Sequence, residues 1–286
     1  MKDTNIQWHP GFIGAMNLEL KKNRGDLLFE KEYNLNTKPL EIDLLVIKKN
    51  ADIQIDNEIG KIFRGHNILE YKSPRDELDI DTFYKASAYA SLYKSYGKTL
   101  DAIKADDVTV SLVRQAKPYG LLRYFEGHGY LVTNPYRGIY YIQKKVLFPT
   151  QIIVTKELKW EEHIWLRSLS DRLEKHNLLE LLEEIENLHG KANREFAWSV
   201  LEVGLEANEQ VVKELMGDGN MSEELLEILK PIIEPKIILR EQQARKEAIK
   251  AAVGLLRNFG HSEKEIEYAI MEQYRLSEEE AELYMK

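Results

Sequence analysis

Residues 41–47 read Glu-Ile-Asp-Leu-Leu-Val-Ile, and residues 67–72 read Asn-Ile-Leu-Glu-Tyr-Lys. Both segments are rich in branched aliphatic residues, a composition typical of β-strands. The first is apolar at nearly every position, which is expected of a strand that is buried on both faces. Strand-like and helical patterns alternate around these segments, which predicts an α/β fold with a mixed sheet flanked by helices.

Further elements are expected on either side of the two segments. The helix after residue 72 has two candidate starts, because Ser73-Pro74-Arg75-Asp76 resembles a capping box with proline in the first turn, while Asp79–Asp81 fits equally well. That helix should continue to about residue 96. The other expected helices cover about residues 10–25 and 119–126, and the other expected strands cover residues 108–114, 130–133, 139–142 and 151–155.

The pattern becomes helical throughout after Trp160. Phe196, Val200, Val203 and Ala207 recur at steps of three or four residues, as on one face of a helix. Two capping boxes, Ser262-x-x-Glu265 and Ser277-x-x-Glu280, predict two short final helices. The sequence therefore predicts an α/β domain over residues 1–158 and an all-α C-terminal extension over residues 159–286.

Charge is distributed unevenly along the chain. Its 286 residues carry a net charge of −8, but residues 1–150 hold 22 Lys and Arg against 19 Asp and Glu. Residues 151–286 hold 18 against 29. Attraction to phosphate is therefore expected from the first half alone. The acidic second half is interpreted first as a set of solvated helix faces.

Composition also limits where the protein works. The sequence has no cysteine, which excludes disulfides and thiolate metal sites. The N-terminus lacks the apolar region of a signal peptide, and no apolar run approaches the roughly 20 residues that span a bilayer. We expect a cytoplasmic protein without a membrane partner.

Glu70-Tyr71-Lys72 is one of several Glu-x-Lys triplets, and its context distinguishes it. Alternation along a strand places Glu70 and Lys72 on one face, about 6–7 Å apart. The copy that begins at Glu19 lies in a helical pattern, and the copy at Glu157 lies at a strand-to-helix boundary. The copy at Glu234 contains a proline. Only the copy at Glu70 follows an acidic strand and precedes a helix start.

Asp43 interrupts an otherwise apolar strand. A carboxylate in such a strand loses hydration at a cost of several kcal/mol unless a cation or strong donors compensate for it. Pairing with a lysine at the end of the strand is one explanation, and a metal ion is the other. Glu70 and Lys72 follow on the next strand, and this favours the metal. Asp43 and Glu70 would bind a hard cation such as Mg²⁺, and Lys72 could orient or deprotonate a water molecule or hold a phosphate oxygen.

This arrangement resembles the PD-(D/E)xK nuclease family, within it a bacterial group described as transposases or recombination-promoting nucleases. The likeness rests on residues 8–11, 41–49 and 63–74 and continues through residues 79–94 and 148–157. It implies a restriction-endonuclease-like core, dependence on Mg²⁺ or Mn²⁺, and endonuclease cleavage of DNA. The proline of the family motif is replaced here by Ile42, which removes no catalytic atom.

The resemblance also implies roles for individual residues. It assigns the catalytic positions to Asp43, Glu70 and Lys72, with Asp43, Glu70 and Tyr71 at the metal. Glu19 is the candidate for the acidic residue that many members carry on the preceding helix, and a solvated helix glutamate is the alternative.

Four further residues are candidates for contact with DNA. Lys85-x-x-x-Tyr89 stands where some relatives have Gln-x-x-x-Tyr, and its spacing places both residues on one helix face. Arg64 and His66 could contact phosphate, although a surface loop explains them as well. The remaining histidines, including His9 and His163, share no spacing that suggests a metal site.

Two questions of function and assembly stay open at this level. The fold could instead be a catalytically silent module that binds nucleic acid or protein, with the acidic helices as its partner surface. Double-strand cleavage often requires two active sites, so a homodimer formed through the C-terminal helices is a further expectation.

Overall fold

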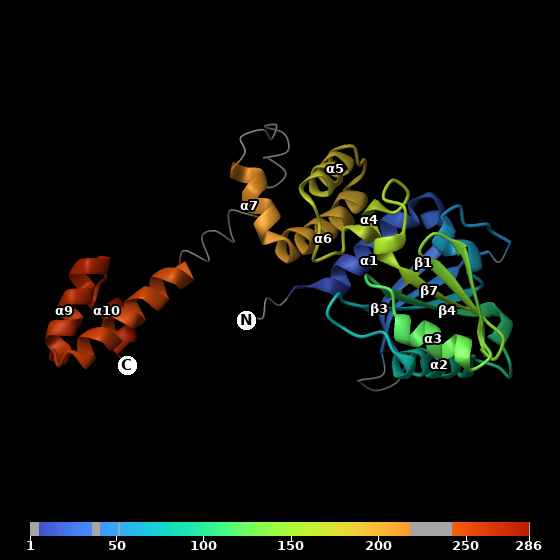
Figure 1. Ribbon diagram of the computed structural model, residues 1–286, viewed down its shortest axis with the longest axis horizontal. Coiled ribbons are helices and arrows are strands. Elements are labelled where there is room, and N and C mark those ends of the chain that lie inside the picture. Colours follow the sequence, from blue (N-terminus) through green and yellow to red (C-terminus); the bar gives the residue numbers. More distant parts are fainter. Residues whose placement is uncertain (1–5, 36–40, 51, 218–241, 286) are drawn as a thin grey trace. The chain divides into compact units, whose positions relative to one another are not determined.

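The computed structural model describes residues 6–35, 41–50, 52–217 and 242–285 (Figure 1). The chain divides into two compact units, residues 1–221 and 222–286, and each is described by itself. The first unit is built on a seven-stranded mixed sheet flanked by helices, so the expected α/β class is confirmed. In chain order the strands are β1 (Leu27–Asn34), β2 (Glu41–Lys48), β3 (His66–Lys72), β4 (Val108–Arg114), β5 (Leu131–Tyr136), β6 (Ile139–Gln143) and β7 (Thr150–Val154).

The strand order in space is β1-β2-β3-β4-β7-β6-β5. Strands β1, β2 and β3 pair antiparallel, β3, β4 and β7 pair parallel, and β7, β6 and β5 pair antiparallel. The parallel step from β3 to β4 requires a crossover connection, and helix α2 (Ile80–Ser95) provides it. The two motif-bearing strands, β2 and β3, are therefore interior neighbours in the sheet.

Strand β1 has no counterpart among the predicted elements. It is one of the two edge strands of the sheet, and its residues Leu-Leu-Phe-Glu-Lys-Glu-Tyr-Asn are mostly exposed or half-buried. An edge strand faces water along much of its length, so it needs neither a continuous apolar run nor strict alternation. The hydrophobic pattern used to find the other strands is weak here for that reason.

Helix α2 begins at the second of its two candidate starts. The side chain of Asp79 accepts a hydrogen bond from the Thr82 backbone N–H at 2.8 Å, which caps the helix. The earlier candidate forms a turn instead, in which Ser73 Oγ donates to Asp76 Oδ2 at 2.6 Å. The segment between β3 and α2 thus turns at residues 74–75 before the helix begins.

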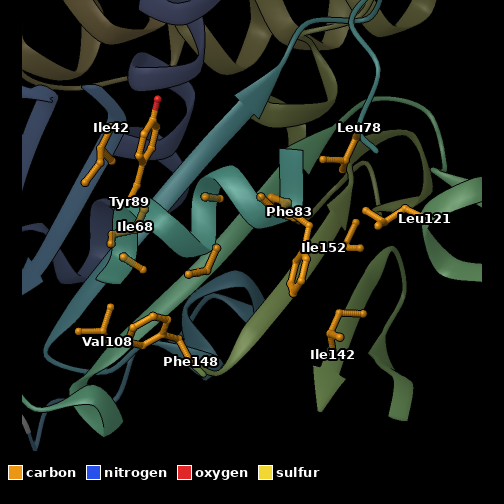
Figure 2. Close-up of a cluster of buried hydrophobic side chains, with 14 of the residues drawn as sticks. Ile42, Ile68, Leu78, Phe83, Tyr89, Val108, Leu121, Ile142, Phe148 and Ile152 are labelled. Carbon is orange, nitrogen blue, oxygen red and sulfur yellow. The ribbon is translucent and has the colours of Figure 1, made fainter. Parts of the chain in front are cut away.

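One face of the sheet packs against α2 and α3 (Tyr119–Gly127), which lie together along it (Figure 1). Figure 2 shows the core formed there, where Phe83 and Tyr89 of α2 meet Ile68, Val108 and Ile152 of the sheet. These side chains are almost completely removed from solvent. Burial of large apolar side chains contributes on the order of 1.5–3 kcal/mol each, so this core fixes α2 over β3 and β4.

Helix α1 (Trp8–Glu19) lies on the face of β3 opposite to α2. Tyr71 alternates with Ile68 and Glu70 along β3, and its ring stacks on Phe12 of α1. Helix α1 packs tightly on α6 (Lys191–Ala207) through its glycines. A Cβ atom at Gly14 would lie 2.6 Å from the carbonyl oxygen of Phe196, and one at Gly11 would lie 2.7 Å from Val203 Cγ2. Only glycine permits this helix–helix approach.

The remaining helices of the first unit are α4 (Ile164–Arg167), α5 (Lys175–Glu186) and α7 (Glu209–Gly217). The boundary expected after residue 158 therefore lies inside the first compact unit. The physical reason is the close packing of α6 on α1, which joins the helical segment to the sheet domain. A change from strand to helix periodicity does not separate one core from another.

The second unit is helical over residues 242–258 and continues with α9 (Glu263–Tyr274) and α10 (Glu278–Met285). Its core contains Ile249, Val253, Ile266, Ile270 and Ala281. Both predicted capping boxes are formed, at Ser262 and at Ser277. The expected C-terminal helices are thus confirmed for the residues described. Within those residues, no helix combines the length and apolarity needed to cross a bilayer.

Candidate active site

Asp43 and Glu70 occupy the point where β2 and β3 stop pairing. The ladder between the two strands runs from Ile47↔His66 to Leu44↔Leu69, one residue short of Asp43 and Glu70. Beyond that point β3 remains paired with β4 as far as Lys72↔Arg114. The three residues predicted to act together therefore lie on adjacent strands, with Glu70 and Lys72 on one face of β3 and Asp43 at the adjoining end of the β2 ladder.

The carboxylate of Asp43 has two partners. Its Oδ2 accepts a hydrogen bond from the backbone N–H of Tyr71 at 2.8 Å, which ties the ends of the two strands together. Its Oδ1 lies 3.5 Å from His9 Nε2, near the start of α1. The interaction with Asp43 raises the pKa of His9 above its ordinary value, against the opposing effect of burial. His9 therefore adds a basic side chain beside the candidate site.

Glu70 is the most deeply buried member of the group, with 4% of its surface exposed. Its Oε1 accepts a hydrogen bond from Lys72 Nζ at 3.0 Å and lies 3.9 Å from Lys85 Nζ on α2. Burial and the negative charge of Asp43 raise the pKa of Glu70, and the two lysines offset this only in part. Loss of hydration on burial is therefore the main cost of ionising Glu70, and the two lysines do not fully offset it.

Lys85 and Tyr89 lie side by side on α2, as their spacing predicts, but they are placed differently with respect to solvent. Lys85 Nζ stands 5.2 Å from the centre of the Tyr89 ring, a cation–π contact, and half of the lysine side chain is exposed. Tyr89 is 4% exposed and packs within the core below α2. Lys85 can reach a ligand, whereas the ring of Tyr89 supports Lys85 from beneath and does not face solvent.

The side chain of Tyr71 points away from the metal position expected for this residue. Its ring stacks on Phe12 at a centroid distance of 4.7 Å on the opposite sheet face, and burial raises the pKa of its phenol. The hydroxyl is buried and has no hydrogen-bond partner among the described residues. Only the main chain of Tyr71 borders the site, because side chains alternate along a strand.

Glu19 does not belong to the Asp43–Glu70 group, which corrects the role expected for it there. It lies ten residues after His9 on α1, or roughly 15 Å along the helix axis. Its carboxylate is buried and accepts hydrogen bonds from Asn57 Nδ2 at 3.0 Å and the Leu166 backbone N–H at 3.2 Å, and it contacts His163 Nδ1 at 3.0 Å. The alternative of a solvated helix glutamate is likewise wrong.

Arg64 and His66 are located at the other end of β3. Four residues of strand separate His66 from Glu70, a distance of roughly 13 Å. His66 Nδ1 is 2.8 Å from the hydroxyl of Tyr93 on α2, and burial lowers the pKa of this histidine. Arg64 is exposed in the loop before the strand. Neither residue is brought to the candidate site.

His9 is the site residue that reasoning from the sequence missed. A histidine near a helix start gives no sign of a partner 34 positions later in the chain, and spacing among the histidines was uninformative. Its only signal was its position in Trp8-His9-Pro10-Gly11, one of the segments that carry the family resemblance.

The donor set fits a hard divalent cation. Asp43 and Glu70 offer carboxylate oxygens, the ligands that Mg²⁺ and Mn²⁺ take, and the backbone N–H of Tyr71 holds one oxygen of Asp43. The incompletely compensated charge of buried Glu70 is the structural feature that such a cation would satisfy. Lys72 and Lys85 alone leave the pKa of Glu70 raised.

Comparison with known proteins does not assign the chain to a family. A scan against protein-family models, a search of curated proteins and a search of solved structures each returned no match. The functional interpretation therefore depends on the geometry of the site and on the motif segments of the sequence.

Proposed function

We propose that the first unit is a restriction-endonuclease-like domain of the PD-(D/E)xK type and that the protein is a Mg²⁺- or Mn²⁺-dependent DNA endonuclease. The observation that carries this proposal is the contact of Lys72 Nζ with Glu70 Oε1 at 3.0 Å, beside the end of the β2–β3 ladder at which Asp43 lies. Two carboxylates and a lysine in this arrangement match the residue types that metal-assisted phosphodiester hydrolysis requires.

Asp43 and Glu70 would hold the cation. When bound, it would neutralise charge on the scissile phosphate and lower the pKa of a coordinated water. Lys72, whose side chain is 20% exposed, orients the attacking water by a hydrogen bond from Nζ. The hydrogen bond from the Tyr71 backbone N–H fixes Asp43, so one of its carboxylate oxygens is held in place before substrate arrives.

His9 and Lys85 provide positive charge beside the carboxylates. His9 approaches Asp43 from α1, and Lys85 approaches Glu70 from α2. The raised pKa of His9 increases its cationic fraction near neutral pH. Both side chains are about half exposed, so each can donate a hydrogen bond to a phosphate oxygen of a bound strand.

DNA is the proposed substrate because the family resemblance implies it and because the residues up to 150 carry a net positive charge, unlike those that follow. A role in transposition or recombination is part of the same proposal and rests on the resemblance alone. The protein is expected to act on DNA in the cytoplasm.

Nicking of supercoiled plasmid by the purified full-length protein tests the proposal. We expect relaxed product in Mg²⁺ or Mn²⁺ and none in excess EDTA. Lys72→Ala should reduce the rate by about 100-fold or more, in line with the loss of a positioned proton-handling group. Lys117→Ala is the matched control, because Lys117 is similarly buried (23% exposed) and also contacts a glutamate, Glu157.

Equal nicking by the Lys72→Ala and wild-type proteins would show that a contaminating enzyme or another site cuts the plasmid. Binding of DNA without any metal-dependent nicking would support the alternative of a catalytically silent module.

A further inference from the structure

A second group of potential metal ligands lies away from Asp43 and Glu70. Glu58 begins the 3₁₀ helix η2 (Glu58–Ile62), and Glu162 and His163 immediately precede α4. One ligand atom from each of the three residues lies within 4.8 Å of the other two. The three come from segments about a hundred residues apart, so the fold, and not a local turn, creates the group.

His163 is the central member. Its side chain is 1% exposed, and its Nε2 has no hydrogen-bond partner within the part of the chain that the structure describes. Nε2 lies 3.7 Å from Glu58 Oε2, an oxygen that is likewise buried and unpartnered among those residues. This separation is too long for a hydrogen bond. Two buried polar atoms therefore face each other with their bonding capacity unused, which is costly without a ligand.

The other ring nitrogen of His163 is fixed. Nδ1 is 3.0 Å from Glu19 Oε2, and Glu19 is itself held by the side chain of Asn57 and the backbone N–H of Leu166. A carboxylate that accepts from one imidazole nitrogen orients the ring and leaves the other nitrogen as a metal ligand. Glu19 thus stands in the position of a supporting residue behind a metal-binding histidine.

We propose that Glu58, Glu162 and His163 bind one divalent transition-metal cation such as Zn²⁺. An imidazole nitrogen with two carboxylates favours such a cation over Mg²⁺ or Ca²⁺, which take oxygen ligands. Glu162 is exposed and accepts a hydrogen bond from Lys159 at 2.8 Å, so it is the ligand that turns inward on binding. No residue of the proposed nuclease site takes part.

The surroundings favour a cation. The group lies in a cavity of about 710 Å³ whose wall also contains Glu180, Glu183 and Glu184. Clustered carboxylates in a hollow raise the local concentration of cations. The cavity leaves room for water or an exogenous ligand in the remaining coordination positions.

A proton is the competitor for the same nitrogen. Burial lowers the pKa of His163, but Glu19, Glu58 and Glu162 together outweigh burial and raise it. The test is made at about pH 8, where protons compete less with the metal for an imidazole than at lower pH.

Isothermal titration of Zn²⁺ into full-length Asp43→Asn protein isolates this site from the proposed nuclease site. We expect one equivalent to bind. Adding Glu162→Gln should weaken Zn²⁺ binding about 10-fold or more, by analogy with the loss of groups that support a metal site. Glu161→Gln is the matched control, because it removes the same charge from the adjacent exposed residue in the same cavity wall and should leave the affinity within about threefold.

His163→Gln should abolish Zn²⁺ binding. If that variant does not fold, the comparison of Glu162→Gln with Glu161→Gln, at two exposed positions, tests the proposal instead. Absence of saturable Zn²⁺ binding to the Asp43→Asn protein would overturn the proposal. Equal weakening by Glu161→Gln and Glu162→Gln would overturn it too, since a diffuse acidic wall would then account for the binding.

Discussion

The charge of Glu70 illustrates, for a single residue, how a buried carboxylate costs stability. A carboxylate that is 4% exposed is poorly hydrated, and the nearby charge of Asp43 adds repulsion. Hydrogen bonding from Lys72 and attraction by Lys85 recover only part of this cost. A site that served stability alone would place an amide or an apolar side chain here.

Glu70→Gln should stabilise the metal-free protein, and increasingly so as the pH rises. Because the pKa of Glu70 is raised in the folded state, its favourable contribution is full below the ordinary glutamate pKa and is lost as the pH rises through the folded value. Urea unfolding in EDTA, from about pH 4 to pH 8, should show the variant gaining on the wild type across that window. A difference that stays constant or shrinks with pH would contradict the electrostatic account.

His9 provides a second residue-level test by NMR. In metal-free wild-type protein the imidazole should titrate with a pKa above 6.5, because its contact with Asp43 is the largest influence on it. In Asp43→Asn the pKa of His9 should fall below that value, since burial then becomes the leading effect. An unchanged titration in the variant would show that His9 and Asp43 do not interact in solution.

The sequence predicted the motif residues better than their surroundings. Alternation along a strand is a local rule, and it correctly placed Glu70 and Lys72 on one face. The contacts of His9 with Asp43 and of Glu19 with His163 depend on how α1 crosses the sheet, which no local pattern encodes. Glu19 and His163 are 144 positions apart in the chain, although their side chains are in contact.

At the scale of elements, the positions of α1 and α6 depend on each other because their backbones pack closely. Gly11 and Gly14 let the backbones approach so closely that a Cβ atom would overlap the opposing helix. Since His9 lies on the same helix, this packing also sets the position of the imidazole beside Asp43. The helical segment after the sheet domain therefore supports the candidate active site.

Gly14→Ala should destabilise the protein by about 1–3 kcal/mol, the usual cost of adding a methyl group to a packed interface. Gly120→Ala is the matched control, because Gly120 also lies in a helix, α3, and a Cβ there meets no described atom within 4 Å. The control should be neutral or stabilising by up to about 1 kcal/mol, as alanine favours a helix more than glycine does. Equal effects of the two substitutions in thermal unfolding would contradict the close α1–α6 packing.

Interior strands were predictable from sequence, and so was part of the edge strand β5, but the edge strand β1 was not. The strands β2, β3, β4 and β7 are buried on both faces and read as apolar runs. Strand β1 carries alternating charges because its outer edge meets water. The two candidate starts of α2 could be separated only by seeing which side chain reaches a free backbone N–H.

For the whole molecule, the boundary between the two compact units does not coincide with the point at which the sequence changes from a strand pattern to a helical one. The first compact unit extends to residue 221 and includes α4 to α7, while residues 222–286 form a second unit with its own small core. The proposed metal site at His163 lies within the first unit, between the sheet domain and its helical segment. Both proposed sites therefore depend on the packing of that segment.

The rate of plasmid nicking by single and double variants is the most direct test of the central claim, that Asp43, Glu70 and Lys72 form one hydrolytic site. If they act as a unit, Asp43→Asn and Lys72→Ala should each reduce the Mg²⁺-dependent rate by about 100-fold or more, and the double variant should be no slower than the worse single variant. Glu41→Gln, on the same strand, should nick at the wild-type rate. Wild-type rates for Asp43→Asn, or losses that multiply in the double variant, would contradict a single shared site.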